Sequence, residues 1–380
     1  MSNNFLNKKI LFVTGTRADF GKLEPLATEA FKKGFSITFF ITGMHMLNKY
    51  GLTKEEVRNH KDFDFFEFIN QRENDSLEII LSKTIFGFSD FVSENNPDLV
   101  VIHGDRIEAL AASLVCSMRY IRTAHIEGGE MSGNIDESFR HCNTKLCSTH
   151  FVSSDLAKRR VLSLGEQENT IFTIGSPELD IHNEDSGVTI EDVKCRYSIN
   201  FDDYGIVIFH PVTSELDTIG DQAHSLFEAL KDTKKKYIVI SPNNDPGSEK
   251  IFPIIESLDE NYFKIIPSMR FRYFSELIKN TSLFIGNSSA GVREVPFLGI
   301  VSIDIGSRQF KRHISDNLLN ISPFDRNFLV KTINSKWGTK TKKSKHFGSG
   351  KSRENFLKVL TNPSYWEIPL QKVFYESNII

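Results

Sequence analysis

Short apolar runs alternate with amphipathic stretches through the first half of the chain. The runs are rich in β-branched and aromatic residues, and each precedes a segment with apolar residues at helical spacing; they are KKILFVTG, SITFFITG, PDLVVIHGD, RTAHIEGG and THFVSS. Consecutive parallel strands need a crossover connection, which is usually a helix. The alternation therefore predicts an α/β fold, with a parallel sheet covered by helices on both faces.

The same pattern starts again after residue 200. The second series of runs comprises YGIVIFHP, KKYIVISPNN, YFKIIPS, SLFIGNSS and GIVSIDIG. The segment between the two series, GSPELDIHNEDSGVTIEDVK, is polar and has no strand pattern. Because the 380 residues exceed the roughly 250 to 300 at which a single core stops growing, we place a domain boundary near residue 180. Two such halves are expected to line a central cleft with their strand ends, where ligands of doubly wound folds bind.

Composition and charge exclude several classes of function. The formal net charge of -3 gives no general attraction to nucleic acid or membranes, so any anion site must be local. The four cysteines lack the spacing of a zinc site or a disulfide framework, which indicates reduced thiols in a cytoplasmic protein. The N-terminal apolar run is too short for a signal peptide, and no run reaches the ~18 residues of a membrane span.

Two strand-to-helix turns are candidate anion sites. In TGTRADFGKLEPL, Arg17 supplies a planar cation beside a helix N-terminus, although a simple ion pair with Asp19 is an equally good interpretation. In SLFIGNSSAGVREVP, Ser288 and Ser289 follow a buried strand and precede a helix that contains Glu294. Ordinary capping would explain serines here, but two serines between two glycines favour a phosphate site.

Histidines and acids follow other strands. HGDR places His103, Asp105 and Arg106 at the end of a strand of the first half, and HPVTSE places His210 after a strand of the second half. Alone, each is more often a structural histidine or a salt bridge. Their convergence on strand ends favours a functional site.

The segment HIEGGEMSGNIDESFRH is unusually rich in acids. Glu127 ends a strand, while Asp136 and Arg140 lie four residues apart on the following helix, where the arginine can orient and ionise the aspartate. Acids crowded together acquire different pKa values, so that one donates a proton while another accepts one. Their spacing does not fit a metal site. The pattern predicts metal-free proton chemistry on a nucleotide substrate whose diphosphate leaves.

Together these residues resemble the UDP-N-acetylglucosamine 2-epimerases, in particular the hydrolysing bacterial branch that makes N-acetylmannosamine (ManNAc) for sialic acid or related nonulosonic acids. The resemblance rests on TGTRADFGKL, TGMHM, HGDRIEALA, HIEGGEMSGNIDESFRHCNTKL, IGSPELD, HPVTSE, SPNNDPGSE, GNSSAGVREVP and DIGSRQ, in the expected order. The residues after the acidic strand, and HPVTSE, favour the hydrolysing branch over the non-hydrolysing one.

The resemblance implies two Rossmann-like domains in the GT-B-like architecture of one glycosyltransferase superfamily. Residues 1–180 would carry the catalytic acids and residues 181–364 would bind the nucleotide, while a C-terminal helix at about residues 365–380 would pack back on the first domain. It also implies anti elimination of UDP from UDP-N-acetylglucosamine (UDP-GlcNAc) to give 2-acetamidoglucal, followed by hydration to ManNAc. Neither cofactor nor metal is implied, because the leaving group drives the elimination.

Residue by residue, the resemblance assigns catalytic roles in both halves. Asp105, Glu127 and Asp136 match the family's acids, and either Asp105 or Glu127 is the leading candidate to take the proton from carbon 2. Arg140 matches the arginine that supports the acids, and His210 matches the residue that assists departure of the diphosphate.

It assigns binding roles as well. Arg17, Ser288 and Ser289 match diphosphate contacts, and Glu294 matches a contact to the ribose hydroxyls. Arg308, Asn243 and Arg106 match nucleotide-side positions, and His45 matches a position that faces the sugar. Relatives are typically dimers, so we expect a homodimer or homotetramer.

Three rivals stay open. Relatives of this branch act on UDP- or GDP-linked 2,4-diacetamido-2,4,6-trideoxy sugars on the way to legionaminic acid. A retaining glycosyltransferase on the same scaffold would pass the sugar to an acceptor. A catalytically silent sugar-nucleotide sensor is disfavoured, because none of the acids is missing. The sequence does not decide the nucleotide, the oligomeric state or any allosteric control.

Overall fold

The computed structural model describes residues 7–48, 52–72, 75–131, 135–184, 187–242, 245–309, 312, 315–373 and 375. The chain divides into two compact units. Unit 1 comprises Met1–Asp180 together with Gly348–Ile380, and unit 2 comprises Ile181–Phe347. The chain therefore leaves unit 1 once and returns to it once.

Unit 1 is built on a seven-stranded parallel sheet in the order β3-β2-β1-β4-β5-β6-β7. Its strands are β1 (Lys9–Thr14), β2 (Ser36–Ile41), β3 (Asp64–Glu67), β4 (Leu99–His103), β5 (Thr123–Ile126), β6 (Thr149–Val152) and β7 (Ile171–Thr173). The central strands are buried on both faces, which explains why they appear as continuous apolar runs rather than alternating ones. The predicted parallel sheet is confirmed.

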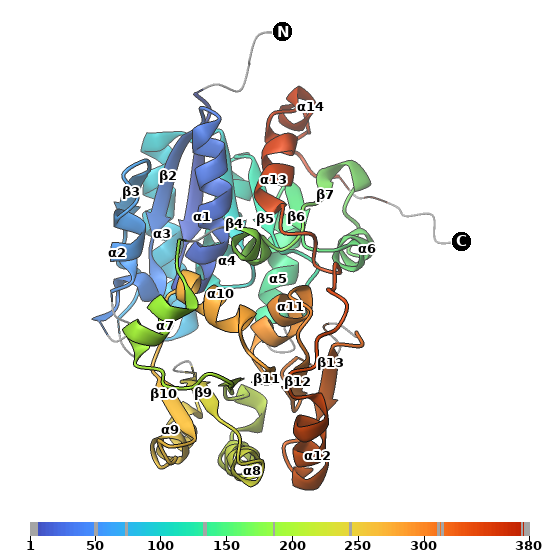
Figure 1. Ribbon diagram of the computed structural model, residues 1–380. Helices are drawn as coiled ribbons and strands as arrows, with labels where there is room; N and C mark the ends of the chain where they lie inside the picture. Colours follow the sequence, from blue (N-terminus) through green and yellow to red (C-terminus); the bar gives the residue numbers. More distant parts are fainter. Residues whose placement is uncertain are drawn as a thin grey trace. The chain divides into compact units, whose positions relative to one another are not determined.

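Helices cover both faces of this sheet. They are α1 (Arg17–Lys32), α2 (Lys54–Arg58), α3 (Leu77–Asn95), α4 (Ile107–Met118), α5 (Ile135–Leu146), α6 (Asp155–Ser163), α13 (Ser352–Leu360) and α14 (Pro363–Trp366), with the short 3-10 turns η1 (Gly43–Met46), η3 (Glu168–Thr170) and η4 (Pro177–Asn183), the last of which continues into unit 2. Helices α3 and α4 pack on one face, and α1 and α13 lie side by side on the other (Figure 1).

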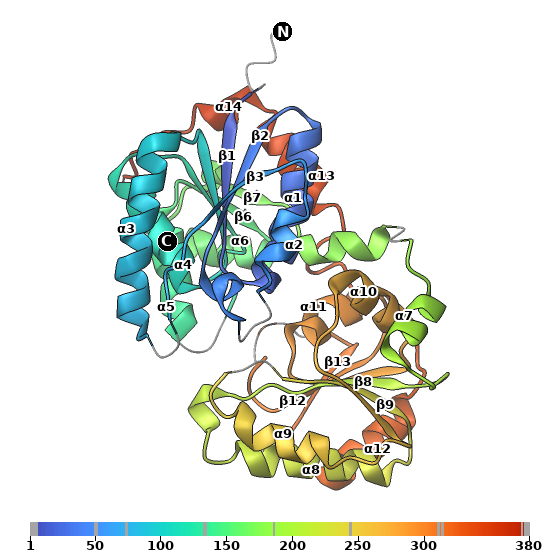
Figure 2. The ribbon, with the colours of Figure 1, turned by 90° about the vertical axis from the view of Figure 1, so that its left-hand side faces the viewer.

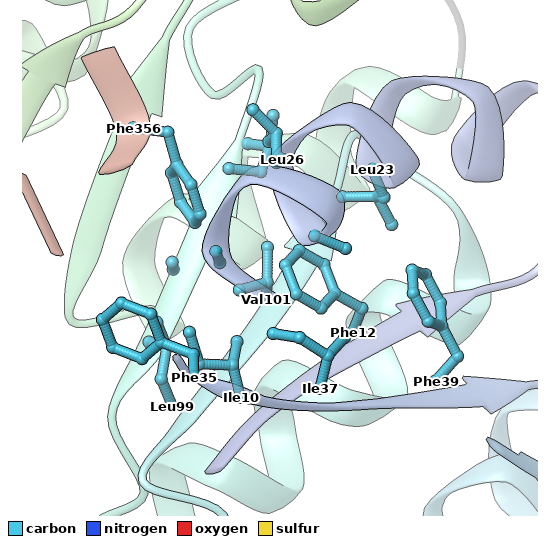
Figure 3. Close-up of a cluster of buried hydrophobic side chains, with 14 of the residues drawn as sticks. Ile10, Phe12, Leu23, Leu26, Phe35, Ile37, Phe39, Leu99, Val101 and Phe356 are labelled. Atoms are coloured by element: carbon cyan, nitrogen blue, oxygen red, sulfur yellow. The ribbon is translucent and has the colours of Figure 1, made fainter. Parts of the chain in front are cut away.

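The core between α1 and the sheet includes the returning chain. Figure 3 shows Leu23 and Leu26 of α1 above Phe12 and Val101 of the strands, with Phe356 of α13 beside them. Burying a phenylalanine this completely stabilises a fold by about 3–5 kcal/mol relative to alanine. Helix α13 thus packs on unit 1 ahead of the segment of about residues 365–380 for which the sequence suggested such a helix. In the described part of that segment, Tyr365 belongs to the same core, with Trp366 and Ile368 packed against it; residues 374 and 376–380 lie outside the described part.

Unit 2 repeats the plan with a six-stranded parallel sheet in the order β10-β9-β8-β11-β12-β13. Its strands are β8 (Gly205–Ile208), β9 (Tyr237–Ile240), β10 (Phe263–Ile266), β11 (Leu283–Gly286), β12 (Ser302–Ile305) and β13 (Leu318–Ile321). Its further elements are α7 (Ile190–Tyr197), α8 (Ile219–Asp232), α9 (Ser248–Glu256), α10 (Phe271–Lys279), α11 (Ser289–Phe297), α12 (Arg326–Lys336) and the 3-10 turn η5 (Thr213–Glu215). Helices α8, α9 and α12 cover one face, and α7, α10 and α11 cover the other (Figure 2).

Strand order reverses at one place in each sheet. β1 pairs with β2 on one side and β4 on the other, and β8 pairs with β9 and β11. Ligands of doubly wound folds bind at the carboxyl ends of the strands beside such a reversal. Of the helices in the described ranges, none has the length and apolarity that crossing a membrane requires.

Candidate active site

Glu127 lies at the centre of a buried polar cluster in unit 1. It directly follows β5 in the left-handed backbone conformation, with φ 63°, which costs a residue other than glycine about 1–2 kcal/mol. The residue is only 2% exposed, and its carboxylate accepts hydrogen bonds from Lys22 Nζ at 3.1 and 3.0 Å and from Ser176 Oγ at 3.0 Å. Strained backbone at a buried charge is typical of a functional site.

His103 joins this carboxylate to a second one. The imidazole Nε2 lies 3.1 Å from Glu127 Oε2, and Nδ1 lies 3.0 Å from Asp19 Oδ1. Burial and the charge of Lys22 favour the neutral ring, but the two carboxylates outweigh them and raise the pKa of His103. Burial disfavours ionised Asp19, yet its hydrogen bond to His103 and that ring's charge lower the Asp19 pKa. The cluster is therefore an interlocked set of ions.

Arg140 connects Glu127 to Asp105. Its Nη1 donates to the main-chain oxygen of Glu127 at 2.6 Å, and its Nη2 forms an ion pair with the Asp105 carboxylate. Asp105 follows β4 and Gly104, and its side chain is 21% exposed, against 3% for Glu127. Asp105 is thus the carboxylate of this pair that a ligand can reach.

Asp136 and Arg106 belong to the same end of the sheet. Asp136 is half-buried in the first turn of α5, on the helix that also carries Arg140. Arg106 precedes α4, and its Nε lies 3.3 Å from Glu108 Oε2. Burial would lower the pKa of Arg106, but the charges of Glu108, Asp19, Asp105 and Asp136 raise it. Arg106 therefore stays cationic among these acids.

Arg17 and His45 have internal partners. Arg17 donates through Nε to Glu56 at 3.0 Å, so the alternative pairing with Asp19 considered from the sequence is replaced by one with Glu56. His45 lies between Thr14 at 2.9 Å and Thr53 at 2.7 Å. Burial lowers the pKa of His45 to about 4, so this ring is neutral near pH 7.

In unit 2, an asparagine joins the ends of β8 and β11. Asn287 Oδ1 accepts from the His210 amide at 2.7 Å, and Asn287 Nδ2 donates to the His210 carbonyl at 2.8 Å. The preceding Gly286 has φ 133°, and a Cβ there would collide with the carbonyl of Ile208. This close approach fixes the backbone of His210, whose side chain is half-buried.

The N-terminus of α11 carries the two serines. Ser288 caps the helix, with its Oγ 3.4 Å from the Ala290 amide, and Ser289 is the first helical residue. Arg308 Nη1 donates to the Asn287 carbonyl at 3.0 Å, and Gln309 Nε2 does so at 2.9 Å. Ser288 therefore acts as the N-cap of α11, as the capping interpretation predicts. Arg308 lies at the same end of the helix, where the helix dipole favours an anion.

Glu294 lies further along α11 and is buried. Its Oε2 lies 2.7 Å from Nε2 of His182, and His182 Nδ1 lies 2.8 Å from Ser275 Oγ. Glu294 is thus held by a histidine rather than by a capping box. Asn243, the remaining candidate, lies outside the described residues.

The sequence interpretation did not select several members of these clusters. They are Asp19, Lys22, Glu108, Ser176, Glu178, His182 and Asn287. His103, which the sequence did indicate, ends β4, and Asn287 follows β11 and could have been found by the same signal. Within the described ranges, no three His, Cys, Asp or Glu side chains are grouped so that they could hold a metal ion.

Comparison with known proteins gives the class and then the family. Two Rossmann-like halves with polar strand ends define the GT-B-like class. The chain is similar to the crystal structure of the Neisseria meningitidis UDP-GlcNAc 2-epimerase bound to UDP-GlcNAc, with a TM-score of 0.80 and 18% sequence identity. The match covers 93% of this chain and 99% of that one. The family model described as UDP-N-acetylglucosamine 2-epimerase matches residues 29–361. The chain belongs to this family.

Three relatives are similar over most of their length. The UDP-N-acetylglucosamine 2-epimerase of N. meningitidis serogroup B is 38% identical, covering 98% of this chain and 100% of the relative. The UDP-N,N'-diacetylbacillosamine 2-epimerase (hydrolyzing) of Legionella pneumophila is 31% identical, covering 93% and 95%. The polysialic acid biosynthesis protein P7 of Escherichia coli is 32% identical, covering 86% and 85%.

Proposed function

We propose that the chain is a hydrolysing UDP-GlcNAc 2-epimerase, which converts UDP-GlcNAc and water to ManNAc and UDP for sialic acid biosynthesis. The observation that carries the proposal is the carboxylate pair at the ends of β4 and β5. One arginine, Arg140, contacts both the Asp105 carboxylate and the main chain of Glu127. A fixed and partly exposed carboxylate is what the removal of a weakly acidic proton requires.

The first step is an elimination. A carboxylate takes the proton from carbon 2, the C2–H electron pair forms the C1=C2 double bond, and the bond between carbon 1 and the diphosphate oxygen breaks. The carbon 2 proton is barely acidic, so its removal has to be coupled to loss of a good leaving group. The products are 2-acetamidoglucal and UDP.

We assign Asp105 as the base of this step. It is the more exposed member of the pair, and Arg140 sets the direction of its carboxylate. Glu127 has buried donors at both oxygens, which suits it to anchor the cluster. Fixed charges around a reacting proton stabilise the transition state without reorganising during the reaction.

The second step adds water to the glucal. The C1=C2 electron pair takes up a proton at carbon 2, from the face opposite to the one that lost it, which gives the manno configuration. The oxygen of water bonds to carbon 1, and this water gives up its surplus proton to solvent. Two faces require two proton carriers. We assign the return of the proton to Asp136, which is half-buried in the helix that also holds Arg140.

The leaving group needs cations and N–H donors. We propose that Ser288, Ser289 and the N-terminus of α11 bind the diphosphate, with His210 and Arg308 beside them. Arg17 and Arg106 of unit 1 stay predictions for the nucleotide, and Glu294 would accept hydrogen bonds from the ribose hydroxyls. Asn243 on the nucleotide side and His45 facing the sugar stay predictions.

The test is turnover of UDP-GlcNAc in deuterated water, followed by proton NMR. Free ManNAc with deuterium at carbon 2 and a stoichiometric amount of UDP is the expected result. Accumulation of UDP-ManNAc would place the chain with the non-hydrolysing epimerases. Absence of turnover without an acceptor sugar would favour a glycosyltransferase instead.

A second substrate is supported by one of the relatives. The L. pneumophila protein, 31% identical, is named for hydrolysing epimerisation of UDP-N,N'-diacetylbacillosamine. Such a sugar differs from GlcNAc at carbons 4 and 6, so the same elimination would apply. The kcat/KM values of the two sugar nucleotides should be compared. If kcat/KM for the diacetamido sugar exceeds that for UDP-GlcNAc by more than about 100-fold, the diacetamido sugar nucleotide is the substrate, because the loss of one polar contact changes kcat/KM by about this factor.

Assembly and location complete the proposal. We propose a homodimer or homotetramer that works in the cytoplasm without a cofactor. Light scattering coupled to size exclusion would give the mass relative to the 43.3 kDa chain. A monomer at micromolar concentration would contradict the proposed assembly without affecting the proposed reaction.

A further inference from the structure

Buried polar side chains alternate along the segment that leaves unit 1 and enters unit 2. Ser176, Glu178, Asp180 and His182 occupy every second position, and each of them is buried. Most of the segment is the 3-10 turn η4. Connecting segments usually expose their polar groups, because burying them without partners is costly. Each of the four therefore requires a partner.

The first two partners belong to the acidic cluster of unit 1. Ser176 Oγ donates to Glu127 Oε1 at 3.0 Å. Glu178 Oε2 lies 2.8 Å from Lys22 Nζ, and the same ammonium lies 3.0 Å from Glu127 Oε2. Glu178 thus holds a cation against the carboxylate at the centre of the cluster.

Asp180 fixes the middle of the segment. Its two oxygens accept the main-chain amides of Ser352 and Arg353, each at 2.8 Å. These amides belong to the first turn of α13, where the helix itself offers them no acceptor, and the N-cap residue of α13 provides no side-chain cap. The segment is thereby tied to the helix on which the chain returns to unit 1.

His182 acts in unit 2. A carboxylate can only accept hydrogen bonds when ionised, so the 2.7 Å contact to Glu294 places the proton on His182 Nε2. Ser275 then bonds Nδ1 at 2.8 Å and fixes the plane of the ring. All three side chains are buried, so Glu294 is held in one orientation.

We propose that Ser176–His182 is a positioning segment for both halves of the reaction. Glu178 sets Lys22, and through it Glu127, for the proton transfer. His182 sets the Glu294 carboxylate for the ribose hydroxyls. Neither residue is catalytic, because each acts through another side chain. The inference rests on the proposed function, in which Glu294 binds ribose and Glu127 belongs to the reacting site.

The His182 half is tested by calorimetry with UDP and with 2′,3′-dideoxy-UDP, which lacks both ribose hydroxyls. We expect the wild-type protein to prefer UDP by about 10- to 100-fold, the range for hydrogen bonds to a charged group. In His182→Leu the preference for UDP should fall below about threefold, while the affinity for the dideoxy analogue stays the same. In His182→Gln, which keeps a donor near the position of Nε2, most of the preference for UDP should be restored.

A control variant separates positioning from general damage. His150→Leu breaks another buried histidine–glutamate pair, the 3.1 Å contact to Glu166 in unit 1, and should leave the preference unchanged. A structural role for His182 would weaken both ligands equally. An unchanged preference in both His182→Leu and Ser275→Ala would overturn this half of the inference.

The Glu178 half is tested by kinetics on UDP-GlcNAc. Glu178→Gln should lower kcat by about 10-fold or more and shift its pH profile, because Lys22 then has one carboxylate partner fewer. The Kd of UDP should stay within about twofold. Glu168→Gln, which removes an exposed partner of Lys158, is the matched control.

Failure of the inference is distinguishable from failure of the function. If wild-type protein forms ManNAc and binds UDP, while Glu178→Gln keeps the wild-type kcat and pH profile, the positioning role is wrong and the function stands. If wild-type protein neither binds UDP nor turns over UDP-GlcNAc, the proposed function itself is wrong.

Discussion

The strand ends of the two units use different chemistry. In unit 1, Glu127, Lys22, His103 and Asp19 hold one another through ion pairs. In unit 2, the ends of β8 and β11 are joined by the neutral amide of Asn287, beside a helix N-terminus. Interlocked charges suit proton transfer, whereas fixed N–H donors suit binding of an anion. The difference supports the proposal that unit 1 carries the chemistry and unit 2 binds the leaving nucleotide.

The ions of unit 1 also stabilise one another's charge states. The pKa of His103 is raised by Glu127 and Asp19 despite burial, and the pKa of Asp19 is lowered by His103. Both shifts favour the charged form of the group over its neutral form. Asp105, the proposed base, lies at the edge of this cluster and has the more exposed carboxylate.

The largest effect is expected from Asp105→Asn. The amide keeps the size of the side chain and can still contact Arg140, but it cannot accept the carbon 2 proton. We expect kcat to fall by about 10³-fold or more, with the Kd of UDP unchanged within about threefold. Deuterium incorporation into product reports the step directly. If Asp105→Asn stays active while Glu127→Gln is inactive, the base is Glu127.

The second largest effect is expected from Asn287→Ala in unit 2, on the affinity for UDP. The substitution leaves the amide and carbonyl of His210 without their partner, at a cost of about 1–3 kcal/mol for each buried group. UDP affinity should fall by about 10- to 100-fold, because His210 and the α11 N-terminus lose their fixed geometry. Asn320→Ala removes an exposed amide that bonds Asp304 at 2.8 Å in the same sheet. A similar loss of affinity in both variants would contradict a special role for Asn287.

Much of the fold could be predicted from the sequence. The apolar run ILFVT coincides with β1, and the polar segment near residue 180 contains the crossing between Asp180 and Ile181. The sequence suggested that the end of the chain returns to unit 1, but it did not indicate that α13 is the helix that packs there first. SRENFLKVL has an ordinary amphipathic pattern, and only the packing of Phe356 against α1 and the sheet identifies its partner.

The site could be predicted by position but not by partner. Residues after parallel strands converge whatever their distance in sequence, which placed Asp105 and Glu127 correctly at strand ends. The pairings depend on tertiary contacts across large separations, such as Lys22 with Glu127 and His103 with Asp19. Arg17 shows the limit, because Glu56 is its partner rather than its neighbour Asp19.

A smaller effect is expected on the pH dependence of stability. Because the folded pKa of His103 lies above its unfolded value of about 6.5, its ion pairs contribute fully below that pH and are lost as pH rises through the folded pKa. Wild-type protein should therefore exceed His103→Gln in free energy of unfolding most at about pH 6 and progressively less above it. Urea unfolding at a series of pH values measures this. A difference that grows with pH would mean that the ring is neutral in the folded state.

The smallest effect is expected from Arg308→Lys, and it sharpens the contrast between the units. Lysine keeps the positive charge at the α11 N-terminus but loses the planar fork that donates to the Asn287 carbonyl at 3.0 Å. If unit 2 acts through fixed donors rather than net charge, UDP affinity should fall by about three- to tenfold while kcat stays unchanged. Arg326→Lys on α12, which alters an exposed ion pair with Asp232 of α8, should change neither value. Full UDP affinity in Arg308→Lys would mean that charge alone holds the diphosphate, and the two units would then differ less than their geometry indicates.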